Sequence, residues 1–442
     1  MPPASPTNGP GASAAGEPDA LHVVPLTSAD ALRVLAVDQV AFFFDPTGIV
    51  PDRDTAHLPW PRTFGAVRGG PHSAQPLAGL YTSYPMVLSA PGPLGTLTRV
   101  PMAGLSWVSV HPDERRRGVL RAMLTHHFQE LHEAGEFLGG LHAAEVGIYG
   151  RFGYAVSSLR VSVTLARGTT FVAPALDEAA ARIRTSFGAA DDAAALTQLQ
   201  QIHLRAAAAM PGTVTRSEDY VRAEYVDRPE RRPRREPDQL MFAYGQDPAA
   251  PTGYAVFSRR QHWEAGQPRG TLTVQEMAAE DAPTLLALAR RLVDFDLVAS
   301  TAFLGRSVDD PLVWWTGSPR GAEVAVHDGL WLRLVEVDRA LVARGYASAC
   351  DVVLDVVDEV CPWNHGRWHL QVDEQGTATC SRTDAPAEVR LPVQALAAAY
   401  LGGRTLAAQQ FEGTVQELVP DSLRPLSRAM STDRQPTGSI EF

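Results

Sequence analysis

The chain has 442 residues, more than one ordinary hydrophobic core accommodates, so we expect two or three domains. Hydrophobic residues make up 45% of the sequence and charged residues 20%, a balance typical of a soluble globular protein. The net charge of −11 argues against a general nucleic-acid-binding protein, whose phosphate contacts need a basic surface, and is compatible with a cationic ligand.

Three further kinds of feature are missing from the sequence. Residues 1–19 contain Pro, Gly, Ala and Ser without an apolar core, so we predict a disordered extension rather than a targeting segment. No apolar run is long enough for a membrane-spanning helix. Cys350, Cys361 and Cys380 are odd in number and lack CxxC spacing, which argues against a disulfide framework or a metal site and favours reduced thiols in a cytoplasmic protein.

The first region of the chain reads as strands and one helix. Strands are predicted at residues 22–25, 77–87 and 95–110. A helix is predicted at residues 28–44, with an apolar face formed by Leu32, Leu35, Ala36 and Val40. Residues 45–75 are rich in Pro, Asp and Gly and are expected to form a long loop, which in a compact domain tends to be functional.

A short basic turn follows the last of these strands and is the most informative stretch of the chain. Residues 109–121 read Ser-Val-His-Pro-Asp-Glu-Arg-Arg-Arg-Gly-Val-Leu-Arg, and apolar residues then recur at helical spacing. A helix N-terminus presents unpaired backbone N–H groups and the positive end of the helix dipole. Gly118 removes a side chain there, so a pyrophosphate could approach closely. Taken alone, the turn is explained equally well as a solvated basic strand-to-helix connection.

The segments after this helix add a strand and a tyrosine-containing element. Gly135 fits the position just after the end of the helix, and residues 137–142 read as a second buried strand. Residues 144–154 then read Ala-Glu-Val-Gly-Ile-Tyr-Gly-Arg-Phe-Gly-Tyr. The pattern loses its period before Phe171, so a domain end near Thr170 is predicted.

Residues 171–328 form a second region, and the pattern changes again from Leu330. In the second region we predict helices at residues 177–187, 193–210 and 281–295, and strands at residues 240–244, 253–258 and 272–277. The proline-broken charge run at residues 228–236 is interpreted as a solvated loop. In the third region we predict strands at residues 330–337, 350–360, 367–372 and 376–381, and helices at residues 338–344, 392–400 and 422–429.

The turn and the segment after it together resemble a known enzyme family. The turn resembles the Arg-x-x-Gly-x-Gly/Ala signature of GNAT acetyltransferases, which hold the pyrophosphate of coenzyme A in this way, although Leu120 stands where that signature has Gly or Ala. The stretches VSVHPDERRRGVLRAM and HAAEVGIYGRFGY resemble the Eis (enhanced intracellular survival) acetyltransferases very closely. The sequence finishes Ser-Ile-Glu-Phe, and members of that family place a terminal Phe carboxylate in the active site.

The resemblance implies a layered α/β (α+β) protein with two GNAT-like domains in tandem, followed by a sterol-carrier-protein-like domain. The domains it implies are an N-terminal GNAT acetyltransferase domain at residues 20–170 after the extension at residues 1–19, a second GNAT-like domain without the cofactor motif at residues 171–328, and the sterol-carrier-protein-like domain, ending in the active-site C-terminus, at residues 329–442. The family forms hexamers, so a homohexamer is expected.

Acetyl-CoA is the cosubstrate that the resemblance implies. The pantetheine arm would meet backbone groups of Val108, Ser109 and Val110, an edge of the strand. The pyrophosphate would be cradled by backbone N–H groups and charge-assisted bonds of the turn, whose residues are Arg115, Arg116, Arg117, Gly118, Val119, Leu120 and Arg121. At least one of the three consecutive arginines is expected to be only solvent-exposed. In the family, the residues at Ala144 and Glu145 also contact the cofactor, here through backbone at Ala144.

Two groups carry the chemistry in the family. Tyr149 matches the general acid residue for residue, and a phenol, with a reference pKa of about 10, still carries its proton at neutral pH. The α-carboxylate of Phe442 matches the family's general base, with the ring anchoring the chain end. Phe152, Tyr154 and His142 are expected to pack in the core rather than to take part.

The walls of the substrate pocket follow the same resemblance. Asp45 and Glu441 would supply negative charge, and Phe43, Trp60 and Trp107 would supply aromatic walls, although plain core packing explains each aromatic equally well.

These features favour an acetyl-CoA-dependent N-acetyltransferase that acts on primary amines of cationic substrates, most of all aminoglycosides. The same chemistry on a protein or peptide lysine or on a polyamine is the first alternative. A carrier of lipids or other hydrophobic ligands, using the C-terminal domain, is the alternative of another class. The turn, Tyr149 and the Glu-Phe end favour the enzyme.

Overall fold

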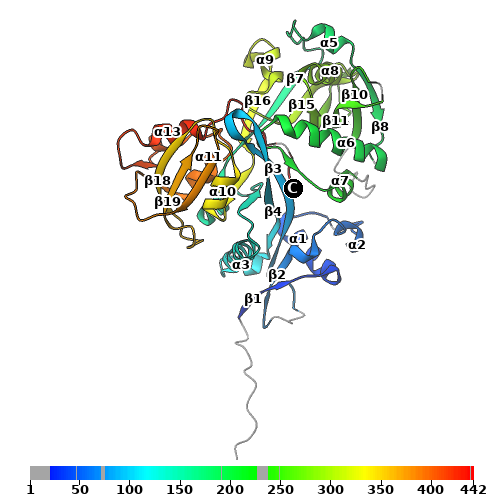
Figure 1. The fold of residues 1–442 in the computed structure, drawn as a ribbon. Coiled ribbons are helices and arrows are strands. Elements are labelled where there is room, and N and C mark those ends of the chain that lie inside the picture. Colours follow the sequence, from blue (N-terminus) through cyan, green and yellow to red (C-terminus); the bar gives the residue numbers. More distant parts are fainter. Residues whose placement is uncertain are drawn as a thin grey trace, which may run out of the picture. The chain divides into compact units, whose positions relative to one another are not determined.

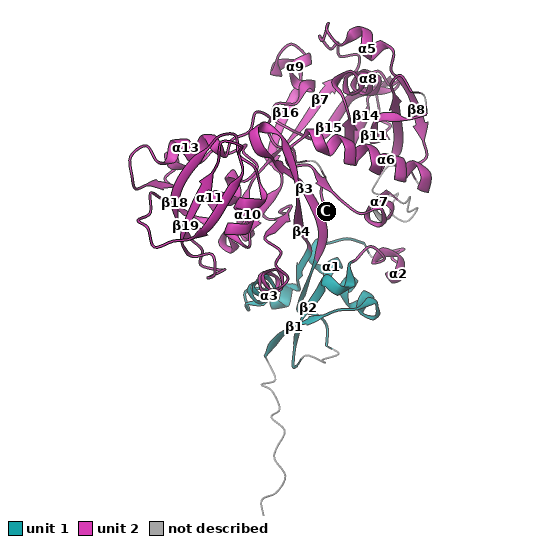
Figure 2. Cartoon of the chain, in the orientation of Figure 1, with its two compact units in different colours: residues 1–46, 59–82, 107–126 teal, residues 47–58, 83–106, 127–442 magenta. Residues whose placement is uncertain are grey.

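The computed structural model describes residues 20–442 apart from residues 46, 71–74, 191, 226–236, 248 and 439 (Figure 1). The predicted extension at residues 1–19 and the predicted solvated charge run at residues 228–236 lie outside the described residues. The chain divides into two compact units (Figure 2). Unit 1 holds residues 1–46, 59–82 and 107–126, and unit 2 holds residues 47–58, 83–106 and 127–442.

Unit 1 contains a small antiparallel sheet and a helix. Strand β1 (Leu21–Pro25) pairs with β2 (Thr63–Arg68), and β2 pairs with the first residues of β3 (Gly79–Pro91). Helix α1 (Ala31–Phe42) follows a 3-10 turn at Ser28–Asp30. Predicted strands and a predicted helix are confirmed here, with the helix ending at Phe42.

The predicted apolar face of this helix is wrong except at Leu35, which is buried. Leu32, Ala36 and Val40 are exposed, and the buried face holds Ala31, Val34, Leu35, Val37 and Asp38. The polar Asp38 is on the buried side because its carboxylate accepts a hydrogen bond from the Ser109 hydroxyl, with 2.8 Å between Oγ and Oδ1. A prediction based only on the spacing of apolar residues cannot detect a buried polar pair such as Asp38 and Ser109.

The predicted long loop at residues 45–75 is also wrong in part. It contains a short helix α2 (Pro51–Asp54), a 3-10 turn at Trp60–Arg62 and the whole of β2. The strand is short and follows prolines, and it forms because β1 and β3 both offer backbone partners to it.

Strand β4 (Leu97–Val110) and helix α3 (Val119–Glu133) each run from one unit into the other along the chain. In unit 2, β4 pairs in parallel with β5 (Leu138–Leu141), with Gly104 opposite Gly140. Strand β17 (Trp331–Leu334), from much later in the sequence, pairs antiparallel with both β5 and β6 (Ala155–Val156). The later part of β3 pairs with β9 (Val214–Thr215).

The end of α3 is built as its sequence predicts. Gly135 takes a left-handed φ of +69°, the Gly135 N–H bonds to His132 O and the Glu136 N–H bonds to Leu131 O. These are the paired bonds of a glycine-terminated helix, and they turn the chain directly into β5.

A seven-stranded sheet in unit 2 forms the second layered region. Its strands, in spatial order, are β16 (Glu323–Asp328), β7 (Leu159–Ala166), β15 (Val298–Arg306), β14 (Gly270–Ala279), β11 (Pro251–Arg260), β10 (Gln239–Tyr244) and β8 (Arg184–Gly188). Its helices are α5 (Asp177–Ala181), α6 (Ala193–Ala206), α7 (Glu218–Tyr225), α8 (Ala282–Val293) and α9 (Pro311–Trp315). Strands β14 and β15 are parallel and are joined through α8.

One predicted helix of this region is wrong in its second half. The helix predicted at residues 177–187 stops at Ala181, and β8 begins at Arg184. Strand β8 pairs antiparallel with β10, for example Phe187 with Met241, and this pairing satisfies the backbone groups on one side of the strand. The pairing partner lies far along the chain, so local periodicity does not report it.

A five-stranded sheet with four helices forms the last region. Its strands, in spatial order, are β20 (Ala378–Arg382), β19 (Gly366–Val372), β18 (Cys350–Val357), β21 (Val389–Pro392) and β22 (Gln416–Glu417). Its helices are α10 (Val337–Ala343), α11 (Val393–Ala399), α12 (Leu406–Phe411) and α13 (Leu423–Ala429). The strands predicted at residues 367–372 and 376–381 are confirmed as the antiparallel pair β19 and β20. Strand β21 and helix α12 were not predicted.

A fully buried arginine ties the helices of this region together. The Arg344 guanidinium donates to the carbonyls of Ala399, Tyr400 and Met430, which lie at the ends of α11 and α13. None of the helices in the described part of the chain combines the length and the apolar character needed to cross a bilayer.

Candidate active site

The basic turn in unit 1 has the backbone of an anion cradle. After β4 ends at Val110, Arg116 adopts a left-handed φ of +62° and Gly118 a φ of +84°, and α3 begins at Val119. Ala122 N–H bonds to Gly118 O, at 3.0 Å, so the amides before Ala122 point out of the helix start. A Cβ on Gly118 would meet nothing within 4 Å, so the positive φ, not crowding, requires glycine there.

The three consecutive arginines of the turn differ in their surroundings. Arg117 Nη1 lies 2.9 Å from Glu114 Oε1, and the other oxygen of Glu114 accepts from Arg68 Nε at 2.8 Å. Arg115 and Arg116 are exposed, as is Arg121 one turn into the helix. Arg117 therefore braces the turn, whereas the other two side chains are accessible to a ligand.

The strand before the turn offers backbone more than side chains. Ser109 is buried, and its hydroxyl is engaged with Asp38. Burial raises the pKa of Asp38 to about 6, with the Ser109 hydrogen bond acting in the opposite direction. Val108 and Val110 are half-buried. Sequence reasoning missed Asp38, whose only signal is an acidic residue at a buried helical position.

Tyr149 is the last residue of a short helix, α4 (Val146–Tyr149), in unit 2. It is 8% exposed, and burial raises the pKa of its hydroxyl to about 12. Within the described residues this hydroxyl makes no hydrogen bond, so its proton is available to a ligand. Ala144 and Glu145, just before α4, are exposed.

The turn after Tyr149 is held by residues from other parts of unit 2. Gln394 Nε2, on α11, donates to Gly150 O at 2.9 Å. Gly153 has a φ of +88°, and a Cβ there would lie 2.6 Å from the Arg333 guanidinium carbon. Arg333, on β17, is itself fully buried and paired with Asp358 at 2.6 Å. Phe152 and Tyr154 are buried, as predicted.

The ring of Phe442 occupies a defined space in unit 2, beside Gly104. A Cβ on Gly104, in β4, would lie 2.9 Å from Phe442 Cε2 and 2.8 Å from Met86 Sδ, so glycine leaves the space that the ring takes. The ring also meets His142 edge-on, with 5.1 Å between ring centroids and 76° between planes. Among the described residues, no cation pairs with the terminal carboxylate.

His142 is half-buried beside this ring and is neutral at physiological pH. Burial, followed by the positive charge of Arg160, lowers the pKa of His142 to about 4, while backbone groups at Ile440 and Gly329 act in the opposite direction. Its Nε2 is buried and has no hydrogen-bond partner in the described part of the chain. His142 was predicted to pack in the core, and it packs against the Phe442 ring while staying half-buried.

Glu441 forms an ion pair with Arg160, at the start of β7. Its negative charge is therefore offset by a neighbouring cation. Sequence reasoning did not single out Arg160 or Gly104. The only signal for Gly104 is a glycine inside an apolar strand, which often marks close approach of another group.

The remaining predicted pocket residues lie in unit 1. Phe43 ends α1 in a left-handed conformation, with a φ of 57°, and is 92% exposed. Asp45 is exposed, and Trp60 and Trp107 are half-buried, with Trp107 at a φ of +55°.

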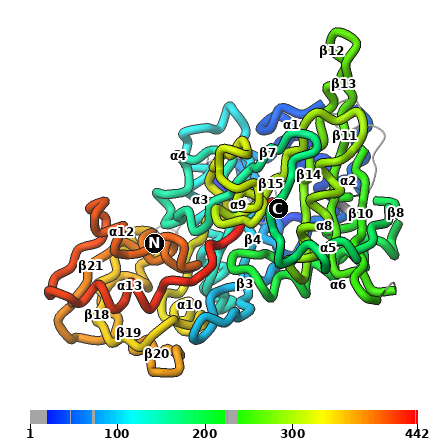
Figure 3. Tube along the Cα trace, turned by 90° about the horizontal axis from the view of Figure 1, so that it is seen from above, coloured from blue at the N-terminus to red at the C-terminus, as the bar shows by residue number. Residues whose placement is uncertain are grey.

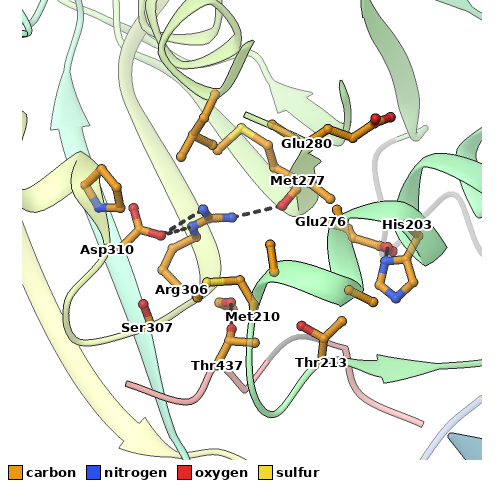
Figure 4. A pocket seen from close by; sticks show the side chains of 18 of the residues that line it. His203, Met210, Thr213, Glu276, Met277, Glu280, Arg306, Ser307, Asp310 and Thr437 are labelled. Carbon is orange, nitrogen blue, oxygen red and sulfur yellow. Dashed lines mark hydrogen bonds and ion pairs between the residues drawn. The ribbon is translucent and has the colours of Figure 1, made fainter. Parts of the chain in front are cut away.

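A cavity of about 240 Å³ lies beside the seven-stranded sheet and is lined by residues at the ends of β14 and β15 (Figure 4). Arg306, on β15, links the two strands by donating to Met277 O of β14 at 2.9 Å and pairs with Asp310 at 2.7 Å. The turn before α8 reads Ala-Glu-Asp, and Asp281 caps the helix by accepting from the Thr284 N–H at 2.7 Å. This turn carries no arginine and already holds a carboxylate at the helix start.

No group of three or more His, Cys, Asp or Glu side chains among the described residues could hold a metal ion.

Three family models match the chain. An acetyltransferase (GNAT) domain model matches residues 23–157, a second acetyltransferase (GNAT) domain model matches residues 212–334, and a sterol carrier protein domain model matches residues 337–438. These matches confirm the predicted order of two GNAT domains followed by a sterol-carrier-protein-like domain.

Known relatives span most of the chain. An uncharacterized N-acetyltransferase of Streptomyces avermitilis is 35% identical over 335 residues, 75% of this chain and 80% of that protein. N-acetyltransferase Eis of Mycobacterium tuberculosis is 30% identical over 404 residues, 89% of this chain and 93% of that protein.

Solved structures share the fold. Eis1 from Mycobacterium abscessus has a TM-score of 0.77 at 28% identity, covering 95% of this chain and 100% of that chain. A GCN5-related N-acetyltransferase from Anabaena variabilis has a TM-score of 0.78 at 17% identity, covering 95% and 100% of the two chains.

Proposed function

Because the chain belongs to the Eis-like GNAT N-acetyltransferases, we propose that it transfers an acetyl group from acetyl-CoA to primary amines of cationic substrates. The observation that carries this proposal is Tyr149, a buried phenol that keeps its proton and has no hydrogen-bond partner among the described residues. It lies in the segment whose sequence resembles the family most closely.

The basic turn would hold the pyrophosphate of acetyl-CoA. Two observations support this role: the amides at the start of α3 point outward, and the exposed Arg115 and Arg116 stand beside them. Backbone of Val108, Ser109 and Val110 would meet the pantetheine arm, because the Ser109 side chain is engaged with Asp38. No second cofactor site is proposed, since the corresponding turn before α8 is acidic.

Two groups of the chain would transfer the protons that the reaction requires. The Phe442 carboxylate would take the proton that the amine loses as the new N–C bond forms, directly or through water. Tyr149 would give its phenolic proton to the thiolate as the C–S bond breaks, and its raised pKa keeps that proton in place at neutral pH. Acetyl-CoA supplies the acetyl group. His142, neutral and packed against the Phe442 ring, would support the chain end without titrating.

Aminoglycosides are the substrate class that we propose first. A chain with a net charge of −11 attracts polycations, and the exposed Asp45 beside the exposed Phe43 suits an amino sugar with charged and apolar faces. Trp60, Trp107 and Glu441 are proposed as further pocket residues, with Glu441 acting beside its partner Arg160. Lysine side chains of proteins and polyamines are the alternatives within the same chemistry.

A lipid carrier is not favoured by the C-terminal domain. Arg344, Tyr346 and Tyr400 lie fully buried inside it, and each bonds to backbone carbonyls. These side chains fill part of the described interior that an apolar guest would need.

A homohexamer in the cytoplasm remains a proposal that rests on the family, and light scattering on the purified protein measures its mass.

One assay tests the proposed function. Thiol release from acetyl-CoA is measured with aminoglycosides, polyamines and lysine peptides at equal amine concentration. Fastest release with aminoglycosides supports the first substrate class, and fastest release with peptides or polyamines replaces it. A protein that binds coenzyme A but releases no thiol with any amine would overturn the proposal.

A further inference from the structure

Residues 434–438 and 440–442, the described residues at the end of the chain, leave the C-terminal region and run across unit 2, the red end of the trace in Figure 3. We call these residues the end segment. Its first part is bonded to the second GNAT domain. Arg434 Nη1 donates to Ala209 O, and the Gln435 N–H donates to Asp309 Oδ2, both at 2.9 Å. The Thr437 hydroxyl donates to Gly305 O at 3.1 Å.

Gly212 lies directly against the backbone of the end segment. A Cβ on Gly212 would lie 2.5 Å from Thr437 O and 3.1 Å from Thr437 N, both backbone atoms of the end segment. The neighbouring Pro211 carbonyl accepts from the Thr437 N–H at 2.9 Å. On its other side, the Gly212 N–H donates to Ser89 O of β3 at 2.8 Å. Gly212 therefore lies between a strand of the first GNAT domain and the end segment.

Gly329 makes a second close approach to the end segment, at Gly438, the residue after Thr437. A Cβ on Gly329 would lie 3.2 Å from Gly438 Cα and 2.8 Å from Ser158 Oγ. A Cβ on Gly438 would in turn lie 3.0 Å from Cβ of Arg160, the residue that pairs with Glu441. The ring of the last residue, Phe442, then lies against Gly104.

The end segment also borders the cavity of the second GNAT domain. Thr437 and Ile440 line this cavity together with Met210, Thr213 and Arg306, and Figure 4 shows Thr437 beside Thr213 and Met210. A segment pushed off Gly212 would have open space beside it. Its position is therefore set by the contacts named above and not by dense packing on every side.

We propose that the second GNAT domain, which lacks the basic turn, serves as a guide for the end segment, with Gly212 and Gly329 as its positioning residues. At Gly212 the backbone of the end segment lies closer than a Cβ would allow, and at Gly329 it lies so close that a Cβ would displace it by a few tenths of an ångström. The two glycines therefore set the path that delivers Phe442 to Gly104 and His142. The inference rests on the proposed function, in which the Phe442 carboxylate accepts the amine proton.

The test compares Gly212→Ala with Gly317→Ala. Both glycines have similar positive φ angles, +83° and +87°, but a Cβ on Gly317 would meet nothing within 4 Å. The pair therefore separates crowding of the end segment from backbone strain. Three quantities are measured on the full chain: release of Phe442 by carboxypeptidase Y, followed by mass spectrometry; coenzyme A affinity by calorimetry; and turnover with saturating acetyl-CoA.

We expect Gly212→Ala to speed the release of Phe442 by on the order of tenfold or more and to lower turnover, with unchanged coenzyme A affinity, and Gly317→Ala to do neither. Unchanged release of Phe442 in folded Gly212→Ala would overturn the guide. Faster release with unchanged turnover would support the guide and overturn the catalytic role of Phe442.

A milder variant covers the case in which Gly212→Ala does not fold. Thr437→Val keeps the side-chain shape and removes only the hydroxyl that donates to Gly305 O. We expect release of Phe442 to rise by about two- to tenfold, the usual effect of one lost hydrogen bond. No change in either release or turnover for this variant would overturn the guide.

Discussion

The aromatic ring of Phe442 lies where the side chain of residue 104 would be, since a Cβ on Gly104 would come within 2.9 Å of Phe442 Cε2. A strand residue in the middle of the first GNAT domain and the last residue of the sequence are thus fitted to one another. We expect Gly104→Ala to push the ring away and to lower turnover by about tenfold or more while the protein stays folded. The conservative control is Gly147→Ala, because a Cβ at Gly147 would meet nothing within 4 Å. Steady-state turnover equal to that of the parent would show that the ring's position beside Gly104 is irrelevant to the chemistry.

Tyr149→Phe should keep coenzyme A affinity and lower turnover by a factor on the order of 10²–10⁴, the usual range for loss of an acid–base group. The substitution removes only the hydroxyl, so packing against Tyr154, with 6.0 Å between ring centroids, is retained. Single-turnover kinetics at saturating acetyl-CoA measures the effect. Near-normal turnover would remove Tyr149 from the mechanism.

The pH dependence of the parent enzyme offers a second measure of Tyr149. Burial raises the pKa of its hydroxyl to about 12, so the acid form persists through the whole range from pH 6 to pH 10. We expect no loss of turnover from Tyr149 as pH rises through this range. A steep alkaline decline below pH 10 that disappears in Tyr149→Phe would contradict this assignment.

Gly118→Asp should abolish binding of coenzyme A, because it places a carboxylate where the pyrophosphate would meet the start of α3. Gly118→Asn is the matched control. It has the same shape and also tolerates the left-handed backbone, whose φ is +84°, but it adds no charge. Calorimetric titration with coenzyme A should give a much larger loss for Asp than for Asn. Equal affinities in both folded variants would mean that the turn is only structural.

A short C-terminal tag, or deletion of Phe442, should nearly eliminate turnover while coenzyme A still binds. The tag turns the α-carboxylate into a neutral amide, and the deletion removes the ring that lies on Gly104. An N-terminal tag is the control and should be harmless, following the sequence-based prediction of an extended start. The idea fails if a C-terminally tagged protein acetylates amines as fast as an untagged one.

Asp38→Asn should stabilise the protein at pH 8 more than at pH 4.5. The folded pKa of Asp38 is raised to about 6 from 3.8, so the native state binds more protons than the unfolded state between these values. Its contribution to stability is therefore present at low pH and is lost as pH rises through the folded pKa. The difference between the two pH values is on the order of 2 kcal/mol, from about 1.4 kcal/mol for each pKa unit.

Chemical denaturation at the two pH values measures this difference. The same substitution at the exposed Asp52 controls for the loss of one negative charge. A variant that is equally stabilised or destabilised at both pH values would show that Asp38 is ionised in the folded protein at low pH.

Local sequence determined the elements whose signals lie within a few residues. The helix α3 and its glycine end at Gly135 follow from short-range rules of periodicity and helix termination, and the structure confirms them. Tyr149 was found because its flanking motif is specific, and its burial agrees with a retained proton.

Tertiary structure decided the features that depend on partners far along the chain. Strand β8 was predicted as helix because its partner β10 is distant, and β17 lies between β5 and β6 although it follows the second GNAT domain in sequence. The face of α1 was mispredicted because a polar pair, Asp38 with Ser109, is buried there. The path of the end segment over Gly212 and Gly329 has no local signature, since a glycine required by close approach looks in sequence like any other. Periodicity reports which side of an element is apolar, but only the folded chain determines which backbone passes over it.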